Sequence, residues 1–119
     1  MAGIQESLSA LMSIDGSLCA SVLDSGSGML LGSIGSGVDL ELAAAGNTEV
    51  VRAKLKTMKS LNLNDRIDDI LITLGKQYHV IRPLQQHDGL FIYLVLDKEK
   101  SNLALARRKV QDVEQKLAV

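Results

Sequence analysis

The stretch between residues 38 and 61 constrains the fold most, because it carries two apolar stripes at helical spacing where a surface helix needs only one. A bulky stripe that suits a core consists of Ala44, Val51, Leu55 and Met58. A stripe of small residues beside it consists of Ala43, Gly46, Val50 and Ala53. Small side chains let another helix approach closely, so we expect a crossover helix with one face on its own sheet and the other on a second subunit. The alternative is a single broad core face in which the glycine is merely tolerated.

Length and composition favour one domain, which we place over residues 1–119. Hydrophobic residues make up 46% and charged residues 23%, as in a globular protein, and the formal net charge of -1 gives no electrostatic reason to expect nucleic acid. The only cysteine, Cys19, lies in an apolar run, as expected of a buried thiol in a reducing compartment. The N-terminal segment has acids and no basic region, and the longest apolar run, residues 90–96, is too short to span a membrane. We therefore expect a cytoplasmic protein without direct membrane insertion.

Hydrophobic periodicity and turn residues predict an α/β three-layer sandwich, in which a sheet of five largely antiparallel strands lies between helices. Asp39 and Ser101 are the predicted N-terminal caps of the second and third helices, and Asn62 suits the end of the second. The strand at 90–96 is the most hydrophobic and should be central, whereas the strand at 68–74 should be covered on both faces. The other elements are expected as a helix over 2–12, strands over 18–23, 29–34 and 78–82, and the long helix over 38–61.

The sequence predicts no catalytic residue, no cofactor site and no metal site. The glycines between residues 26 and 37 lack the lysine of a phosphate loop and the third glycine of a dinucleotide-binding turn. His79 and His87 are the only histidines, and with one cysteine they form no cluster at metal-ligand spacing. The positive run at 107–109 is interpreted as the solvated face of a helix.

Several segments follow one another in a characteristic order. Ile14 to Gly16 leads into an apolar strand that ends at Asp24, and a glycine-bearing hairpin follows over residues 26–32. The apolar segment 69–75 lies in the middle, and the hydrophobic strand 89–97 precedes the sequence SNLALAR at 101–107. In this order they resemble the Roadblock/dynein-light-chain domain family, especially its small bacterial members, over about residues 4–117. The extra Ser-Gly in the first hairpin and the polar link at 62–65 depart from the common pattern.

The resemblance implies a profilin-like fold with the strands in the order 2-1-5-4-3, and a homodimer. In that family the third strand pairs with its copy, and the long helices pack antiparallel over the join. An unpaired edge as apolar as residues 70–72 is an aggregation liability in a monomer, and a two-fold interface removes it. The predicted interface residues are Ala43, Gly46, Val50, Ala53, Ile70, Leu71 and Ile72.

The resemblance also implies a noncatalytic regulator or scaffold of a small Ras-like GTPase or another NTPase. Such a protein acts by ordering the switch loops of its partner. The predicted partner surface is the exposed side of the paired helices, at Glu49, Arg52, Lys56 and Lys59. The alternative is a small-molecule-sensing module, because related sandwich folds hold ligands under the sheet, although the chain has few aromatic residues to line such a site. An enzyme is the third and least favoured hypothesis.

Overall fold

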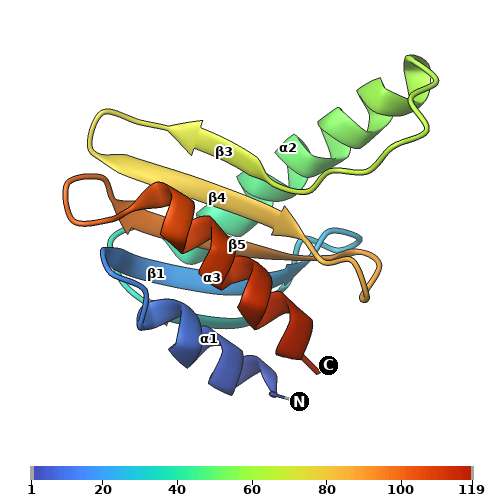
Figure 1. Cartoon of the computed structure of the whole chain (residues 1–119). Coiled ribbons are helices and arrows are strands. Elements are labelled where there is room, and N and C mark those ends of the chain that lie inside the picture. Colours follow the sequence, from blue (N-terminus) through green and yellow to red (C-terminus); the bar gives the residue numbers. More distant parts are fainter. Residues whose placement is uncertain (1, 119) are drawn as a thin grey trace.

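The computed structural model describes residues 2–118, and within them it contains three helices and five strands (Figure 1). The predicted succession of elements is confirmed, while the two end residues of the expected domain, 1 and 119, lie outside the described part. The elements are α1 (Ile4–Met12), β1 (Ser17–Asp24), β2 (Leu30–Gly35), α2 (Leu40–Ser60), β3 (Ile70–Thr73), β4 (Gln77–Pro83), β5 (Leu90–Asp97) and α3 (Leu103–Lys116).

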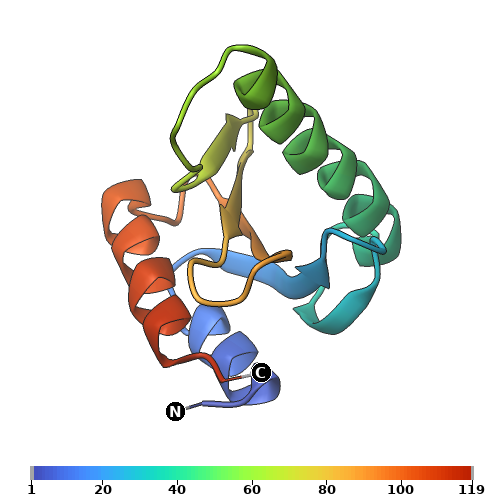
Figure 2. The ribbon, with the colours of Figure 1, turned by 90° about the vertical axis from the view of Figure 1, so that its right-hand side faces the viewer.

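The sheet has the strand order β2-β1-β5-β4-β3, and every neighbouring pair is antiparallel. α1 and α3 cover one face, and α2 lies on the other (Figure 1, Figure 2). α2 carries the chain from the edge strand β2 to the opposite edge strand β3. The predicted three-layer sandwich and strand order are therefore confirmed.

β1 and β5 lie side by side in the sheet and are buried on both faces. Their alternate side chains enter two separate core clusters, one beneath α1 and α3 and one beneath α2. A strand with helices on both sides needs apolar residues at successive positions rather than at alternate ones. The continuous apolar sequence of β5 thus reflects its central place, as predicted.

α2 begins and ends within two residues of the predicted bounds 38 and 61. Asp39 caps its first turn, because the Asp39 carboxylate accepts the backbone N–H of Leu42 at 3.1 Å. Beyond its last turn, Asn62 adopts a φ of 55°, the left-handed conformation that asparagine tolerates better than most residues. Both local signals acted as predicted because they depend only on neighbouring backbone groups.

The predicted cap of α3 was wrong by one residue. The Asn102 side chain, not that of Ser101, accepts the N–H of Leu105 at 3.1 Å. Ser101 instead donates its hydroxyl to the carbonyl of Asp97 at 2.8 Å and stabilises the turn that follows β5. Serine and asparagine both suit a cap, so the sequence of this turn did not distinguish between them.

β3 is shorter and less covered than predicted. Its residues Ile70, Leu71 and Ile72 are only partly buried and Thr73 is exposed, so the expected cover on both faces is wrong for the single chain. Leu55 is likewise 47% exposed although it belongs to the predicted core stripe. The reason is the path of α2, whose C-terminal turns project past the sheet (Figure 1). We call these turns, residues 54–60, the overhang.

The two ends of the described chain meet beside α1 and α3 (Figure 1). Ala2 forms a parallel bridge with Leu117. The N–H of Ala2 donates to the carbonyl of Lys116, and the N–H of Ala118 donates to the carbonyl of Ala2, both at 2.6 Å. These hydrogen bonds hold both ends close to α1 and α3, the two helices on the sheet face opposite α2.

Candidate dimerisation and partner-binding surface

One exposed side of α2 carries an uncovered row of apolar and small side chains. Leu42 is 71% exposed, Val50 39% and Leu61 61%. Large apolar side chains exposed in a row on a charged helix indicate a contact surface. We call this row the outer stripe; its members, at intervals of 4, 4, 3, 4 and 4 residues, are Leu42, Gly46, Val50, Ala53, Thr57 and Leu61.

The outer stripe is self-complementary, because its intervals read the same in both directions. When two copies of α2 lie antiparallel with Val50 opposite Ala53, the leucine at each end of the stripe meets the leucine at the other end of its partner. The small residues then lie in the middle, where two crossing helices are closest. A two-fold axis requires such a surface, in which the same residues appear on both sides.

Gly46 has no structural reason within its own chain. A Cβ added at this position would meet no atom within 4 Å, yet glycine in a helix interior costs about 1 kcal/mol relative to alanine. A close neighbour outside the chain would account for it. Ala43, which the sequence placed in the same interface, is partly buried and packs on the core cluster beneath α2.

The open edge of β3 is a second uncovered surface. β3 pairs only with β4, so the peptide groups on its outer side have no strand partner. Ile70 and Ile72 pack on the core cluster beneath α2 and Leu71 on the opposite one, and all three remain partly exposed. The overhang of α2 extends beyond this same edge (Figure 1). Apart from Ala43, the predicted interface residues thus lie on two surfaces that adjoin one side of the molecule.

The four residues of the predicted partner surface do not have equivalent surroundings. Glu49, Lys56 and Lys59 are exposed on α2. Arg52 is exposed too, but its guanidinium donates to two carbonyls of the β1–β2 turn, those of Ser25 at 2.8 Å and of the following residue at 2.5 Å. These hydrogen bonds from Arg52 link the β1–β2 turn to α2. The sequence gave no signal for this contact between distant segments.

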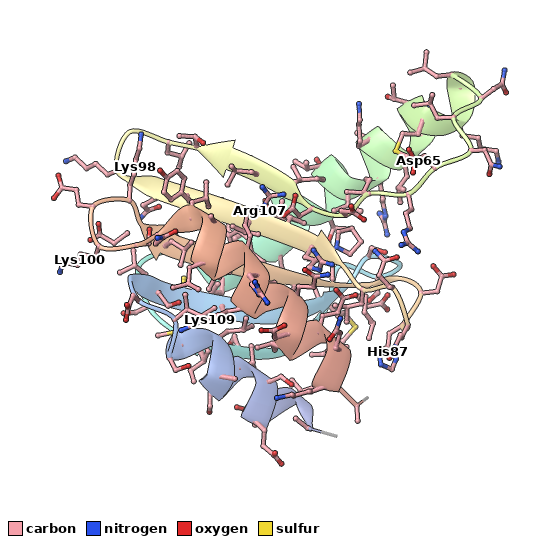
Figure 3. The ribbon with its side chains drawn as sticks, in the orientation of Figure 1. Asp65, His87, Lys98, Lys100, Arg107 and Lys109 are labelled. Atoms are coloured by element: carbon pink, nitrogen blue, oxygen red, sulfur yellow. The ribbon has the colours of Figure 1, made fainter. Side chains whose placement is uncertain are left out.

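A polar trough of about 880 Å³ lies between α3 and the segment before β3. Arg107 reaches across it from α3 and donates two hydrogen bonds to Asp69, at 2.7 and 2.8 Å, which raise the pKa of the guanidinium (Figure 3). At one end, Glu114 accepts from Arg82 at 2.5 Å and from the N–H of Gln85 at 2.6 Å. The side chains of this last ion pair are only 12% and 7% exposed. These contacts brace α3 against the sheet, and hydrophobic periodicity could not have predicted them.

The remaining chemistry-bearing side chains considered in the sequence are a cysteine and two histidines. Burial raises the pKa of the Cys19 thiol, which opposes the thiolate form that a nucleophile requires. His79 lies on β4 against Tyr93, and His87 lies in the β4–β5 turn. Among residues 2–118, no group of three histidines, cysteines or acids is placed to hold a metal ion. In the same part of the chain, none of the helices combines the length and the apolar character needed to cross a membrane.

Comparison with known proteins identifies the fold. Neither a protein-family model nor a curated protein sequence matches the chain. Among solved structures, a Roadblock/LC7 domain from Streptomyces avermitilis matches with a TM-score of 0.81 at 11% identity, over 96% of this chain and 93% of that one. MglB of Myxococcus xanthus matches with a TM-score of 0.79 at 14% identity, over 92% and 89%. An MglB structure with a tetrameric arrangement gives 0.82 at 14% identity, over 94% and 82%.

Proposed function

We propose that this chain, which has the fold of Roadblock/LC7 domains, is a noncatalytic homodimeric regulator or scaffold in the cytoplasm whose partner is a small Ras-like GTPase or another NTPase. The observation that carries the proposal is the outer stripe of α2, an exposed apolar surface that is complementary to itself. The tetrameric arrangement of one MglB structure is in keeping with self-association of this fold. The GTPase partner follows from the sequence resemblance to the Roadblock family.

In the proposed dimer, the outer stripes of two α2 helices pack antiparallel and the two β3 strands pair along their open edges. The overhang of each helix then lies over the partially exposed end of the other sheet, where it covers Ile70 and Ile72. Both uncovered surfaces of the single chain are buried by one two-fold operation. The remaining exposed side of the paired helices carries Glu49, Lys56 and Lys59, which we assign to the NTPase.

In this proposal the protein acts on its partner by binding and ordering it rather than by supplying a reacting group. A regulator of this kind favours one conformation of the partner's switch loops, and its effect equals its difference in affinity for the two conformations. Preference for the GTP-bound or the GDP-bound partner is therefore the property that distinguishes a regulator from a scaffold.

Analytical ultracentrifugation at micromolar concentration tests the dimer. We expect the mass of two chains, and we expect Leu42→Asp to produce a folded monomer, because a charge would face the leucine at the end of the partner's stripe. Leu105→Asp is the matched control, since Leu105 is 45% exposed on α3 and away from α2. A wild-type protein that sediments as a monomer would overturn this part of the proposal.

Binding to a Ras-like GTPase encoded beside this chain in its genome tests the partner. The GTPase is loaded with GDP or with a non-hydrolysable GTP analogue, and affinity is measured by calorimetry. Lys56→Glu combined with Lys59→Glu should weaken binding while the dimer persists. Lys116→Glu, at the far end of α3, should have no effect. A failure of the wild-type dimer to bind any neighbouring GTPase or other NTPase would remove this assignment.

A cleft favours a second candidate function, that of a small-molecule sensor. It has a volume of about 390 Å³ and lies between α2 and the β4–β5 turn, where Val51, Leu55 and Phe91 contribute apolar surface. Ligand sites of small molecules commonly have such a volume and such a lining. A thermal-shift screen against a metabolite panel tests it. The sensor is supported by a ligand that raises the melting temperature of the wild type but not of Leu55→Glu, and excluded by the lack of any such ligand.

A further inference from the structure

A histidine lies at the centre of a polar cluster on the sheet face that α2 covers only in part. Both ring nitrogens of His79, on β4, have partners: Nδ1 lies 3.0 Å from the hydroxyl of Tyr93, and Nε2 lies 2.9 Å from Oε1 of Gln77. The ring also packs edge-on against Tyr93, with ring centres 5.5 Å apart and planes at 76°. His79 is therefore held in one orientation by two hydrogen bonds and one aromatic contact.

These hydrogen bonds suit the neutral imidazole. Nε2–H donates to the amide oxygen of Gln77, and the hydroxyl of Tyr93 donates to Nδ1, so each polar atom has the role it needs. A protonated ring has two donors, and the Tyr93 hydroxyl would then have to accept from Nδ1 and turn its own proton elsewhere. Tyr93 is only 1% exposed, so rearranging its hydroxyl inside the protein is costly.

The charged surroundings of His79 offer no compensation for a positive charge. β3 presents Ile72 opposite His79, β1 contributes Cys19 and α2 contributes Asn47, both near Tyr93. The acid on this face of β5 is Asp97, whose carboxylate accepts the N–H of the residue two positions later at 3.0 Å. Burial alone lowers the pKa of His79 from its ordinary value of 6.5. The overhang carries Lys54, Lys56 and Lys59 and no acid.

We propose that protonation of His79 weakens the homodimer, so that the protein dissociates reversibly on mild acidification. The inference rests on the proposed dimer, in which the overhang of the second copy covers this part of the sheet. Covering it removes the remaining water from His79 and brings lysines, not carboxylates, close to the ring. The dimer therefore favours the neutral form more than the monomer does.

The direction follows from proton binding. Because the pKa of His79 is lower in the dimer than in the monomer, the separated chains bind more protons near this pKa, and acid favours dissociation. Because each dimer contains two copies of His79, we expect the dissociation constant to rise about a hundredfold at pH values below the pKa of the ring in either state. Above about pH 8 the ring is neutral in both states and the effect disappears.

Sedimentation equilibrium of the full chain between about pH 8 and about pH 5.5 tests the proposal. We expect the dissociation constant of the wild type to rise as the pH falls, and that of His79→Gln to stay nearly constant. His87→Gln is the control. His87 and Lys98 lie at opposite ends of the sheet (Figure 3), and Nε2 of His87 lies 3.3 Å from the carbonyl of Leu117, which follows α3. This variant should keep the wild-type response.

The outcomes separate this inference from the proposed dimer. A monomer at about pH 8 contradicts the dimer itself. A dimer whose dissociation constant does not change with pH, or changes equally in His79→Gln, overturns the role of His79. If His79→Gln does not fold, NMR titration of the wild-type ring replaces it: the pKa of His79 should be lower in concentrated protein than in dilute protein, and equal values overturn the inference.

Discussion

Gly46→Leu should have opposite effects on the single chain and on the dimer. In the single chain, an added side chain at Gly46 enters open space, with no atom within 4 Å of the new Cβ. Leucine also forms helices better than glycine by about 0.8 kcal/mol. The free energy of unfolding of the monomer should therefore increase by about that amount, which corresponds to a rise of about 3 °C in the melting temperature.

In the dimer the same leucine enters the closest part of the helix pair. Forcing extra methylene groups into a packed contact costs about 1–3 kcal/mol, and the two-fold axis introduces the cost twice. The dissociation constant should therefore increase between about 30-fold and about 25,000-fold. The monomer should thus become more stable while the dimer becomes weaker. A substitution that simply damages the fold would lower both the stability of the monomer and the affinity of the dimer.

Two measurements check this prediction. Denaturant unfolding at a concentration below the dissociation constant gives the stability of the monomer, and sedimentation equilibrium gives the affinity. Ser9→Leu is the matched control, because Ser9 is exposed on α1 and this helix lies on the other face of the sheet. It should leave the dissociation constant unchanged. An unaltered dimer in Gly46→Leu would refute the assignment of the outer stripe to the interface.

Three further substitutions probe the fold. Glu114→Ala leaves the Arg82 guanidinium buried without its carboxylate and should lower the free energy of unfolding by about 3–5 kcal/mol, measured by urea titration. Gly35→Ala should lower the free energy of unfolding by more than about 2 kcal/mol in the same assay, because φ is +84° and the new Cβ would lie 2.3 Å from a backbone oxygen. Gly75→Ala is its control: the added Cβ meets no atom within 4 Å and should be tolerated. Asn102→Ala removes the cap of α3 and should cost about 1 kcal/mol, seen as a lower melting temperature by circular dichroism.

Local patterns predicted most of the fold because the strands and helices of this chain have strong sequence signals. The run from Leu90 to Leu96 predicted a central strand, and the carboxylate of Asp39 acts on a backbone N–H three residues away. The strand order came from the family resemblance rather than from any residue, because pairing between distant strands leaves no periodic signal. The error at Ser101 arose where two adjacent residues offered equivalent chemistry.

The parts that sequence patterns missed depend on distance in the chain or on the geometry of the sheet. Arg52 was assigned to a partner surface, and nothing near it in sequence indicates that its guanidinium binds the β1–β2 turn. The buried Glu114 looked like any acid on a helix until its partner on β4 was known. Leu55 fits the period of a core residue, but the period does not record where the sheet beneath the helix ends.

The bridge between Ala2 and Leu117 places the two ends of the described chain side by side. A larger protein could therefore accommodate the whole unit within a single surface loop without distorting either flank. Fluorophores or affinity handles joined to both ends would stay close together and clear of α2. Energy transfer between labels on two associated chains would then report how far apart their α1/α3 faces lie.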